Sequence, residues 1–213
     1  MSLLMFFQTP DQVVVLTDTL ATTPSGTPHL FVTKCTVVPH LEMVVAYTGA
    51  AQVGHRWSHQ LESAVLARDI DLLNPHVPGA LRSISAEVAQ EFGDHGITST
   101  VYHLGFSEER GTYVGYVYRS VAEYASEVME PGFRVKPQPL HGPTAPTDLD
   151  GMIALGKQLR EEQDGLSGVE RVHIGGDLVV TMLVNRQIQI AKVFRFDDFD
   201  SQWETMNVAL HLD

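Results

Sequence analysis

The sequence contains one cysteine and lacks any long hydrophobic run. Cys35 cannot form a disulfide bond within the chain, which is consistent with a reducing compartment. No apolar stretch approaches the roughly 18 to 20 residues that a membrane-spanning helix needs. The short apolar run at residues 3–7 also lacks the basic flank and cleavage site of a signal peptide. We therefore expect a cytoplasmic protein without a membrane partner.

Basic residues are also scarce. The chain has 14 Lys and Arg residues against 26 Asp and Glu residues, which gives a formal net charge of −12. A polyanion such as DNA or RNA would be repelled over most of such a surface, and the sequence has no cluster of basic residues as a local exception. We therefore expect no nucleic-acid partner.

Length and composition indicate one folded domain. The 213 residues are 44% hydrophobic and 19% charged, which is typical of a globular protein with one sizeable core. We predict a single domain over residues 1–213, with an acidic tail from about residue 195 whose structure the sequence leaves ambiguous.

The first half of the chain predicts two β-hairpins followed by two helices. Residues 19–29 have the composition of a loop between the hairpins. Apolar residues then recur at intervals of three and four over residues 49–68 and 78–92, which is the period of an amphipathic helix. The predicted hairpin arms are residues 3–8, 12–17, 30–38 and 41–47.

The second half predicts two further hairpins, a helix and a Pro-rich loop. Five prolines within residues 131–146 exclude a helix or a central strand there and leave room for at most a short strand at 133–136. A helix is expected from an N-cap at Thr147 to about Glu162, because acidic residues follow the cap. The predicted hairpin arms are residues 98–106, 112–119, 177–184 and 187–194.

The order of these elements predicts an α+β fold. Strands and helices are segregated along the chain, whereas a parallel α/β sheet requires them to alternate. Two antiparallel sheets enclosed between helix layers, a four-layer αββα sandwich, fit this order.

One continuous stretch resembles the β-subunits of proteasomes and their bacterial relatives. Residues 13–22 resemble the family's hydrophobic strand followed by Asp-x-x-Ala-Thr, here Asp18 to Thr22. The resemblance continues without a gap through Lys34 to residues 44–50, which are similar to the second hairpin and the small-residue turn before the first long helix. The chain thus looks like a threonine-peptidase relative within the N-terminal nucleophile (Ntn) hydrolase superfamily, whose fold is the four-layer sandwich.

The resemblance implies a catalytic set of Ser2, Asp18 and Lys34. Ser2 and Asp18, and Asp18 and Lys34, are each 16 residues apart, which matches the spacing of the family. A free α-amine has a pKa of about 7.7 to 8.0, so at neutral pH the amine of Ser2 would act as the base for its own hydroxyl. Lys34 would favour the neutral amine by repulsion between like charges, and Asp18 would hold Lys34 in place.

The resemblance also implies where a substrate would bind. Backbone N–H groups around Thr48 and Gly49, at the turn into the first helix, would form the oxyanion hole. Ala46 and Thr22 complete the predicted oxyanion and substrate-binding residues. The implied substrate is a peptide or a small amide, without a cofactor or metal.

Several positions depart from the family pattern. The family usually has Thr where this chain has Ser2, and Met1 must be removed before Ser2 has a free amine. Residues 175–184 resemble the family's Gly-Gly and following strand, but Ile174 stands in place of a serine and Arg171 in place of a supporting aspartate. A Gly-Ser-Gly turn that the family places after the third hairpin is also missing.

Two functions therefore remain open. The chain is either an amide-bond hydrolase that attacks through Ser2, or a non-catalytic relative that keeps the sandwich as a scaffold. Under both hypotheses the resemblance implies a homo-oligomer, since the resembling families assemble into rings through their helical layers.

Two other groups of residues are weaker candidates. His55 and His59 lie four residues apart on a predicted helix, but the sequence between them lacks the glutamate of a zinc-protease motif. Cys35 follows Lys34 on a predicted strand, so their side chains should point to opposite faces and Cys35 should be a buried core thiol.

Overall fold

The computed structural model describes residues 3–23, 25–64, 67–93, 98–140, 142, 145–168 and 171–210. Its strands are β1 (Leu4–Gln8), β2 (Gln12–Asp18), β3 (Leu20–Thr22), β4 (Pro28–Phe31), β5 (Cys35–Val38), β6 (Met43–Gly49), β7 (Ser99–Ser107), β8 (Thr112–Arg119), β9 (Ser126–Met129), β10 (Gly132–Lys136), β11 (Asp177–Val184) and β12 (Gln187–Arg195). Its α-helices are α1 (Ala51–Ala64), α2 (Ile70–Leu73), α3 (Val77–Phe92), α4 (Leu149–Asp164) and α5 (Phe199–Leu210).

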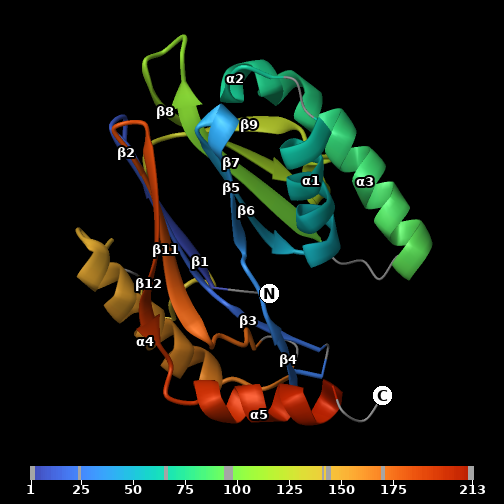
Figure 1. Cartoon of the computed structure of the whole chain (residues 1–213), viewed down its shortest axis with the longest axis vertical. Coiled ribbons are helices and arrows are strands. Elements are labelled where there is room, and N and C mark those ends of the chain that lie inside the picture. Colours follow the sequence, from blue (N-terminus) through green and yellow to red (C-terminus); the bar gives the residue numbers. More distant parts are fainter. Residues whose placement is uncertain are drawn as a thin grey trace.

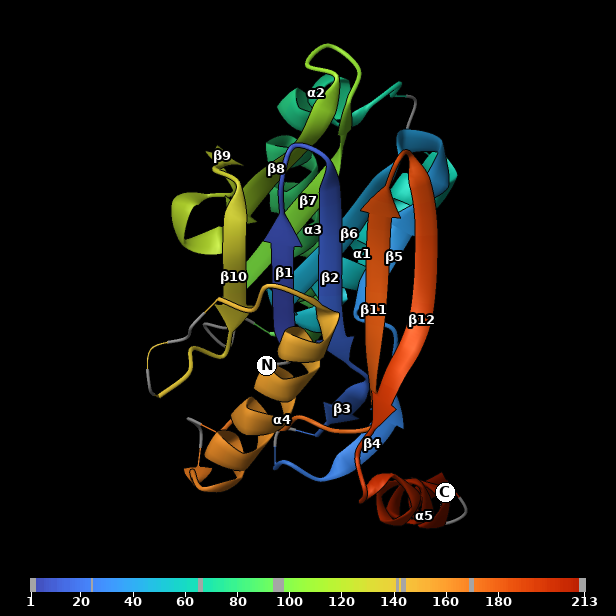
Figure 2. The same ribbon diagram turned by 90° about the vertical axis from the view of Figure 1, so that its left-hand side faces the viewer.

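The strands of the described residues form two five-stranded antiparallel sheets and a separate pair. We call the sheet with strand order β10-β1-β2-β11-β12 sheet I, and the sheet with order β5-β6-β7-β8-β9 sheet II. Strands β3 and β4 pair with each other beyond the ends of both sheets (Figure 1). Figure 2 shows sheet I face on, with α4 lying across the lower part of its outer face. The prediction of an α+β protein with antiparallel sheets is confirmed.

Alternation of side chains along the strands divides the core into three clusters. One cluster lies between the sheets, a second lies between sheet II and helices α1 to α3, and a third lies between sheet I and α4. The cluster between the sheets includes Leu4, Phe6, Val13 and Val15 of sheet I and Val44, Ala46, Tyr102, Leu104 and Val117 of sheet II.

Most predicted elements are confirmed. Their apolar residues recur with the period of the helix or strand and form the face that the element buries. The three hairpins β1–β2, β7–β8 and β11–β12 lie where the sequence predicts them, and so do helices α1, α3 and α4. The short strand predicted at residues 133–136 is β10, which pairs with β1 at the edge of sheet I.

The structure corrects the sequence prediction at residues 19–38. Residues 19–29 are not only a loop, because β3 lies within them and β4 begins there. The single strand predicted at 30–38 is divided into β4 and β5, which belong to different sheets. Lys34 lies in the connection between them, so this break in the strand determines where its side chain goes.

Three smaller corrections concern helix ends and missed elements. Asp148, not Thr147, caps α4, because its Oδ1 accepts a hydrogen bond of 2.8 Å from the backbone N–H of Gly151. Strand β9 was not predicted, since three of its four residues are exposed and the apolar alternation is absent. The ambiguous tail contains α5, which packs against β4 through stacked rings of Phe31 and Phe199 with centroids 4.6 Å apart.

Among the described residues, none of the helices combines the length and apolar character needed to cross a bilayer.

Candidate functional site

The predicted residues Asp18 and Lys34 form a buried ion pair. Asp18 is the last residue of β2 and is 0% exposed, and Lys34 precedes β5 and is 5% exposed. The Lys34 Nζ donates a hydrogen bond of 2.7 Å to Asp18 Oδ1 and another to the carbonyl oxygen of Leu20. The structure therefore brings together two residues that the sequence prediction paired.

The carboxylate of Asp18 also joins two further segments of the chain. Its Oδ1 accepts a bond of 3.0 Å from the backbone N–H of Leu3, and its Oδ2 accepts one of 3.1 Å from the backbone N–H of Gly175. Asp18 thus anchors the start of β1, the segment before β5 and the turn before β11 at one point.

Opposing influences act on the charge of Lys34. Burial lowers the pKa of the ammonium group, because removal from water disfavours its charged form. The negative charge of Asp18 and the hydrogen bond between the two side chains act in the opposite direction. The net effect is a pKa below the ordinary value for lysine.

The predicted oxyanion residues lie at the end of β6. Ala46 pairs in register with Cys35, the residue after Lys34, so β6 runs directly beside the buried ion pair. Ala46 is fully buried between the sheets, and Thr48 is 6% exposed. Gly49 ends the strand with a φ of +91°, and a Cβ there would lie 1.9 Å from the carbonyl oxygen of Thr98. Only glycine fits this turn into α1.

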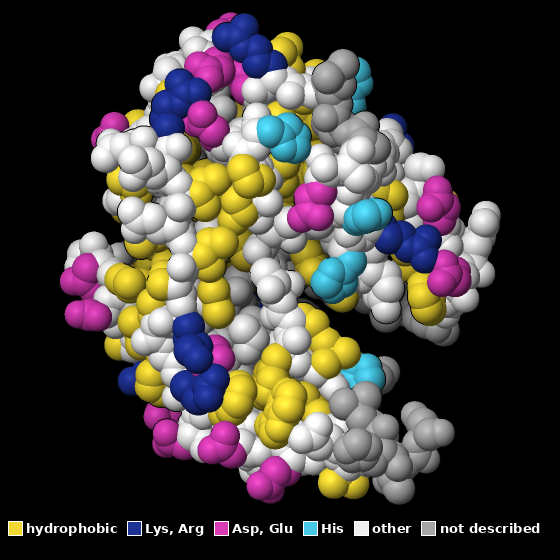
Figure 3. Space-filling view, in the orientation of Figure 1, with side chains coloured by type: hydrophobic (Ala, Val, Ile, Leu, Met, Phe, Trp, Pro, Cys, Tyr) yellow, Lys and Arg dark blue, Asp and Glu magenta, His cyan; other side chains and the backbone are white. Residues whose placement is uncertain are grey.

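Two predicted residues lie outside this cluster of contacts. Ser2 falls outside the residues that the structure describes. Thr22 is at the end of β3, where it pairs with Pro28 and is partly exposed. In Figure 1, β3, the start of β1 and the end of β6 all lie toward the end of the two sheets that faces α5. Figure 3 shows the surface hollowed between α3 and the end of the molecule that carries α5.

The two departures from the family pattern near β11 have structural roles of their own. Ile174 is 1% exposed and belongs to the core between sheet I and α4. Arg171 donates a hydrogen bond of 2.6 Å to Oδ1 of Asp164, the last residue of α4. Neither residue supplies a hydroxyl or a carboxylate to the Asp18–Lys34 pair.

Cys35 is a buried core thiol, as its place on the strand predicts. It lies in the cluster between the sheets, and burial raises the pKa of the thiol to about 12. A thiol with so high a pKa stays protonated at neutral pH and is a poor nucleophile.

The sequence prediction missed the polar residues that neighbour the end of β6. The Lys136 Nζ, on β10, lies 3.4 Å from the Thr48 Oγ1, which connects the two sheets at this edge. Tyr102 and Arg119 of sheet II line the same cavity as Lys136. No short-range pattern could indicate these residues, since β10 meets sheet II only through the packing of the sheets.

Comparison with known proteins gives no match that would assign a role to the site. No protein-family model matches the chain, and no curated protein sequence matches it.

Proposed function

We propose that the chain is a proteasome-like Ntn hydrolase that cleaves amide or peptide bonds through Ser2 once Met1 has been removed. The observation that carries this proposal is the double hydrogen bond at Asp18 Oδ1, which accepts from both the Lys34 side chain and the Leu3 backbone. Leu3 is bonded directly to Ser2, so the contact brings the predicted nucleophile's neighbour next to the predicted lysine. The layering of α1 to α3, sheet II, sheet I and α4 supports the αββα sandwich of the same superfamily.

The proposed reaction uses groups that the chain itself supplies. The Ser2 Oγ attacks the substrate carbonyl carbon while the Ser2 α-amine takes the hydroxyl proton. Backbone N–H groups near Thr48 and Gly49 stabilise the oxyanion. The tetrahedral intermediate collapses, the leaving amine takes the proton, and the C–N bond breaks to leave an ester on Ser2. Water, deprotonated by the same amine, then hydrolyses that ester and regenerates the hydroxyl.

The test compares two proteins that differ by one residue. One begins at Ser2 after cleavage of a removable leader, and the other retains Met1. We expect an electrophilic peptide vinyl sulfone to add one inhibitor mass to the first protein and none to the second, because only in the first does Ser2 itself carry a free α-amine. Intact mass spectrometry checks this result, and Ser2→Ala is the control for modification elsewhere. Absence of an adduct on the protein that begins at Ser2 would contradict the proposal.

A second variant tests the role of Lys34. Lys34→Met removes the charge that holds the amine neutral, so we expect the rate of vinyl sulfone addition to Ser2 to fall by about 100-fold or more. The fall should become smaller at higher pH, where the amine is neutral without help. A Lys34→Met rate that is reduced equally at every pH would show a structural effect only.

The second candidate function is a non-catalytic scaffold with the same fold. The burial of Ile174 and the pairing of Arg171 with Asp164 favour it, because both positions of the family pattern are committed to packing or to a surface ion pair. If this function is correct, the protein that begins at Ser2 will resist the inhibitor even though Asp18 and Lys34 remain in contact.

We further propose that the protein is a homo-oligomer. Trp203 and Val208 on α5 are 51% and 61% exposed, and they give this helix apolar surface that a second copy of the chain would cover. Sedimentation velocity should show a species larger than the 23.5 kDa chain, and the Trp203→Glu substitution should lower the fraction of protein in that species. A monomer at micromolar concentration would contradict this proposal.

A further inference from the structure

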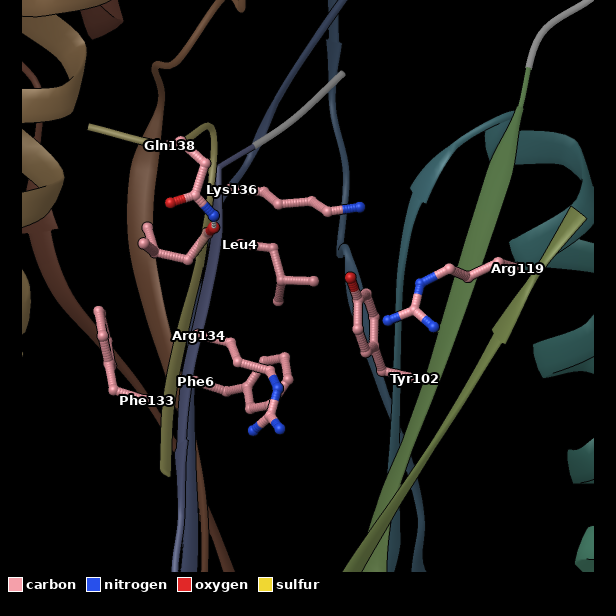
Figure 4. A pocket seen from close by; sticks show the side chains of 9 residues that line it. Leu4, Phe6, Tyr102, Arg119, Phe133, Arg134, Lys136 and Gln138 are labelled. Atoms are coloured by element: carbon pink, nitrogen blue, oxygen red, sulfur yellow. Dashed lines mark hydrogen bonds between the residues drawn. The ribbon is translucent and has the colours of Figure 1, made fainter. Parts of the chain in front are cut away.

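A cationic cavity lies where the two sheets separate, next to the predicted active site. It has a volume of ≈ 280 Å³ and contains three charged residues, all of them basic. Figure 4 shows Lys136 of β10 extending across the gap toward the hydroxyl of Tyr102 and the guanidinium of Arg119, which come from sheet II. Arg134, also on β10, lies beside the ring of Phe6 (Figure 4).

Strand register explains why these cations face the gap. Lys136 pairs with Leu4, and Arg134 pairs with Phe6, and both apolar partners belong to the core between the sheets. Residues directly opposite each other on paired strands share a face, so both cations point between the sheets. Arg119 follows Val117 by two positions on β8 and therefore shares the inward face of sheet II.

Two of the three cations have only neutral partners among the described residues. Lys136 contacts the Thr48 hydroxyl and lies 5.8 Å from the centroid of the Tyr102 ring. Arg134 donates a 2.9 Å hydrogen bond to the carbonyl oxygen of Glu130. Arg119, by contrast, forms an ion pair with Glu127. The cavity therefore keeps an excess of positive charge, although the chain as a whole carries −12.

We infer that this cavity binds the carboxylate of an acidic substrate. An oxyanion between Lys136 and the guanidinium groups would gain charge-assisted hydrogen bonds in a partly water-excluded site. Leu4, Phe6 and Tyr102 provide apolar walls for a short carbon stem that carries the anion. The Tyr102 hydroxyl is placed among the cations as a further donor (Figure 4).

The position of the cavity makes it a subsite for substrate selection, and in this respect the inference rests on the proposed function. Lys136 contacts Thr48 at the end of β6, where the oxyanion hole is proposed. A peptide whose scissile carbonyl lies at that turn could place a Glu or Asp side chain in the cavity. Binding of the carboxylate does not itself require a nucleophile, so the subsite can be tested without turnover.

The experiment measures binding to the Ser2→Ala protein by NMR titration of the ¹⁵N-labelled chain. The probes are acetyl-Leu-Glu-amide, the matched neutral peptide acetyl-Leu-Gln-amide, and inorganic phosphate. We expect the Glu peptide to bind at least about tenfold more tightly than the Gln peptide and to shift backbone amides of β10 and β7. Lys136→Gln and Arg134→Gln should each weaken binding of the Glu peptide by roughly tenfold. Lys192→Gln, on the far strand of sheet I, makes the same change of charge and should have no effect.

Each other outcome overturns either the inferred subsite or the proposed function. Equal affinities for the Glu and Gln peptides would contradict the inference that the cavity recognises a carboxylate. Phosphate that binds more tightly than the Glu peptide, and is weakened by the same two variants, would replace the carboxylate with a phosphate-bearing ligand. If the Glu peptide binds as expected but the vinyl sulfone never modifies the protein that begins at Ser2, the subsite stands and the hydrolase proposal fails.

Discussion

Two buried polar pairs, one in each half of the molecule, meet the cost of burial in different ways. Asp18 and Lys34 form an ion pair, and each makes further hydrogen bonds with the backbone. Trp57 of α1 and His103 of β7 form a neutral pair, in which the indole N–H donates a 2.7 Å bond to Nε2 of His103. The Nδ1 of His103 is buried and has no partner among the described residues.

The difference follows from where each pair lies. The ion pair lies at the ends of strands, where the backbone N–H groups of Leu3 and Gly175 bond to the carboxylate and the Leu20 carbonyl oxygen accepts from Lys34. His103 lies between sheet II and α1, where its neighbours are aromatic, and burial lowers its pKa to about 3. A charge is retained only where hydrogen bonds can compensate for the loss of water.

The largest expected effect comes from breaking the ion pair at its acidic end. Asp18→Asn leaves the Lys34 ammonium buried without a counter-charge, so we expect a loss of about 3–5 kcal/mol in the free energy of unfolding. Lys34→Met should cost less, because the carboxylate keeps its bonds from Leu3 and Gly175. Urea unfolding of both variants at pH 7 measures the difference. A loss below about 1 kcal/mol for Asp18→Asn would mean that the pair is hydrated.

The next effect concerns the pH dependence of the neutral pair. The pKa of His103 is lowered to about 3 in the folded protein, against about 6.5 in the unfolded chain. Below pH 6.5 the unfolded chain therefore binds a proton that the folded protein does not, and stability falls as the pH falls. Between pH 7 and pH 5 this loss should be about 2 kcal/mol.

A matched variant isolates the contribution of His103 from that of the carboxylates. His103→Gln keeps an acceptor for the Trp57 N–H but does not titrate in this range. Urea unfolding of the two proteins at pH 7 and pH 5 should show a smaller decrease for the variant. Equal decreases would show that His103 is not responsible for the pH dependence.

The smallest effect is expected at an exposed ion pair beside Trp57. Arg56 on α1 pairs with Glu87 and Glu91 on α3, and all three side chains are at least a third exposed. Arg56→Gln should change the free energy of unfolding by less than about 1 kcal/mol, and added salt should reduce the change further. If Arg56→Gln changed the free energy of unfolding by several kcal/mol independently of salt, solvent exposure would not explain why this pair should contribute less than the Asp18–Lys34 pair.

Much of the fold could be predicted from the sequence, because its elements bury one regular face. The apolar periods of α1, α3 and α4, and the paired arms of three hairpins, are local patterns. Strand β9 has no such pattern, since it is an exposed edge strand. The break between β4 and β5 could not be predicted either, because a continuous apolar run does not show that its halves join different sheets.

The candidate site divides in the same way. Asp18, Lys34 and the Gly49 turn were predicted from one continuous stretch of sequence, and the structure brings Asp18 and Lys34 into contact. The bond from Gly175 to Asp18 joins residues 157 positions apart, so no local pattern could reveal it.

By itself, the sequence determined the elements and the spacing of the predicted catalytic residues, because periodicity and spacing are properties of neighbouring positions. Only the tertiary structure decided that the Asp18 carboxylate unites three segments, and that Lys136 and Arg119 converge from opposite sheets. The physical reason is that strand order and sheet packing are set by burial of the whole core. Strand order and sheet packing thus bring together side chains from distant parts of the sequence, and the local sequence around one of them gives no information about the other.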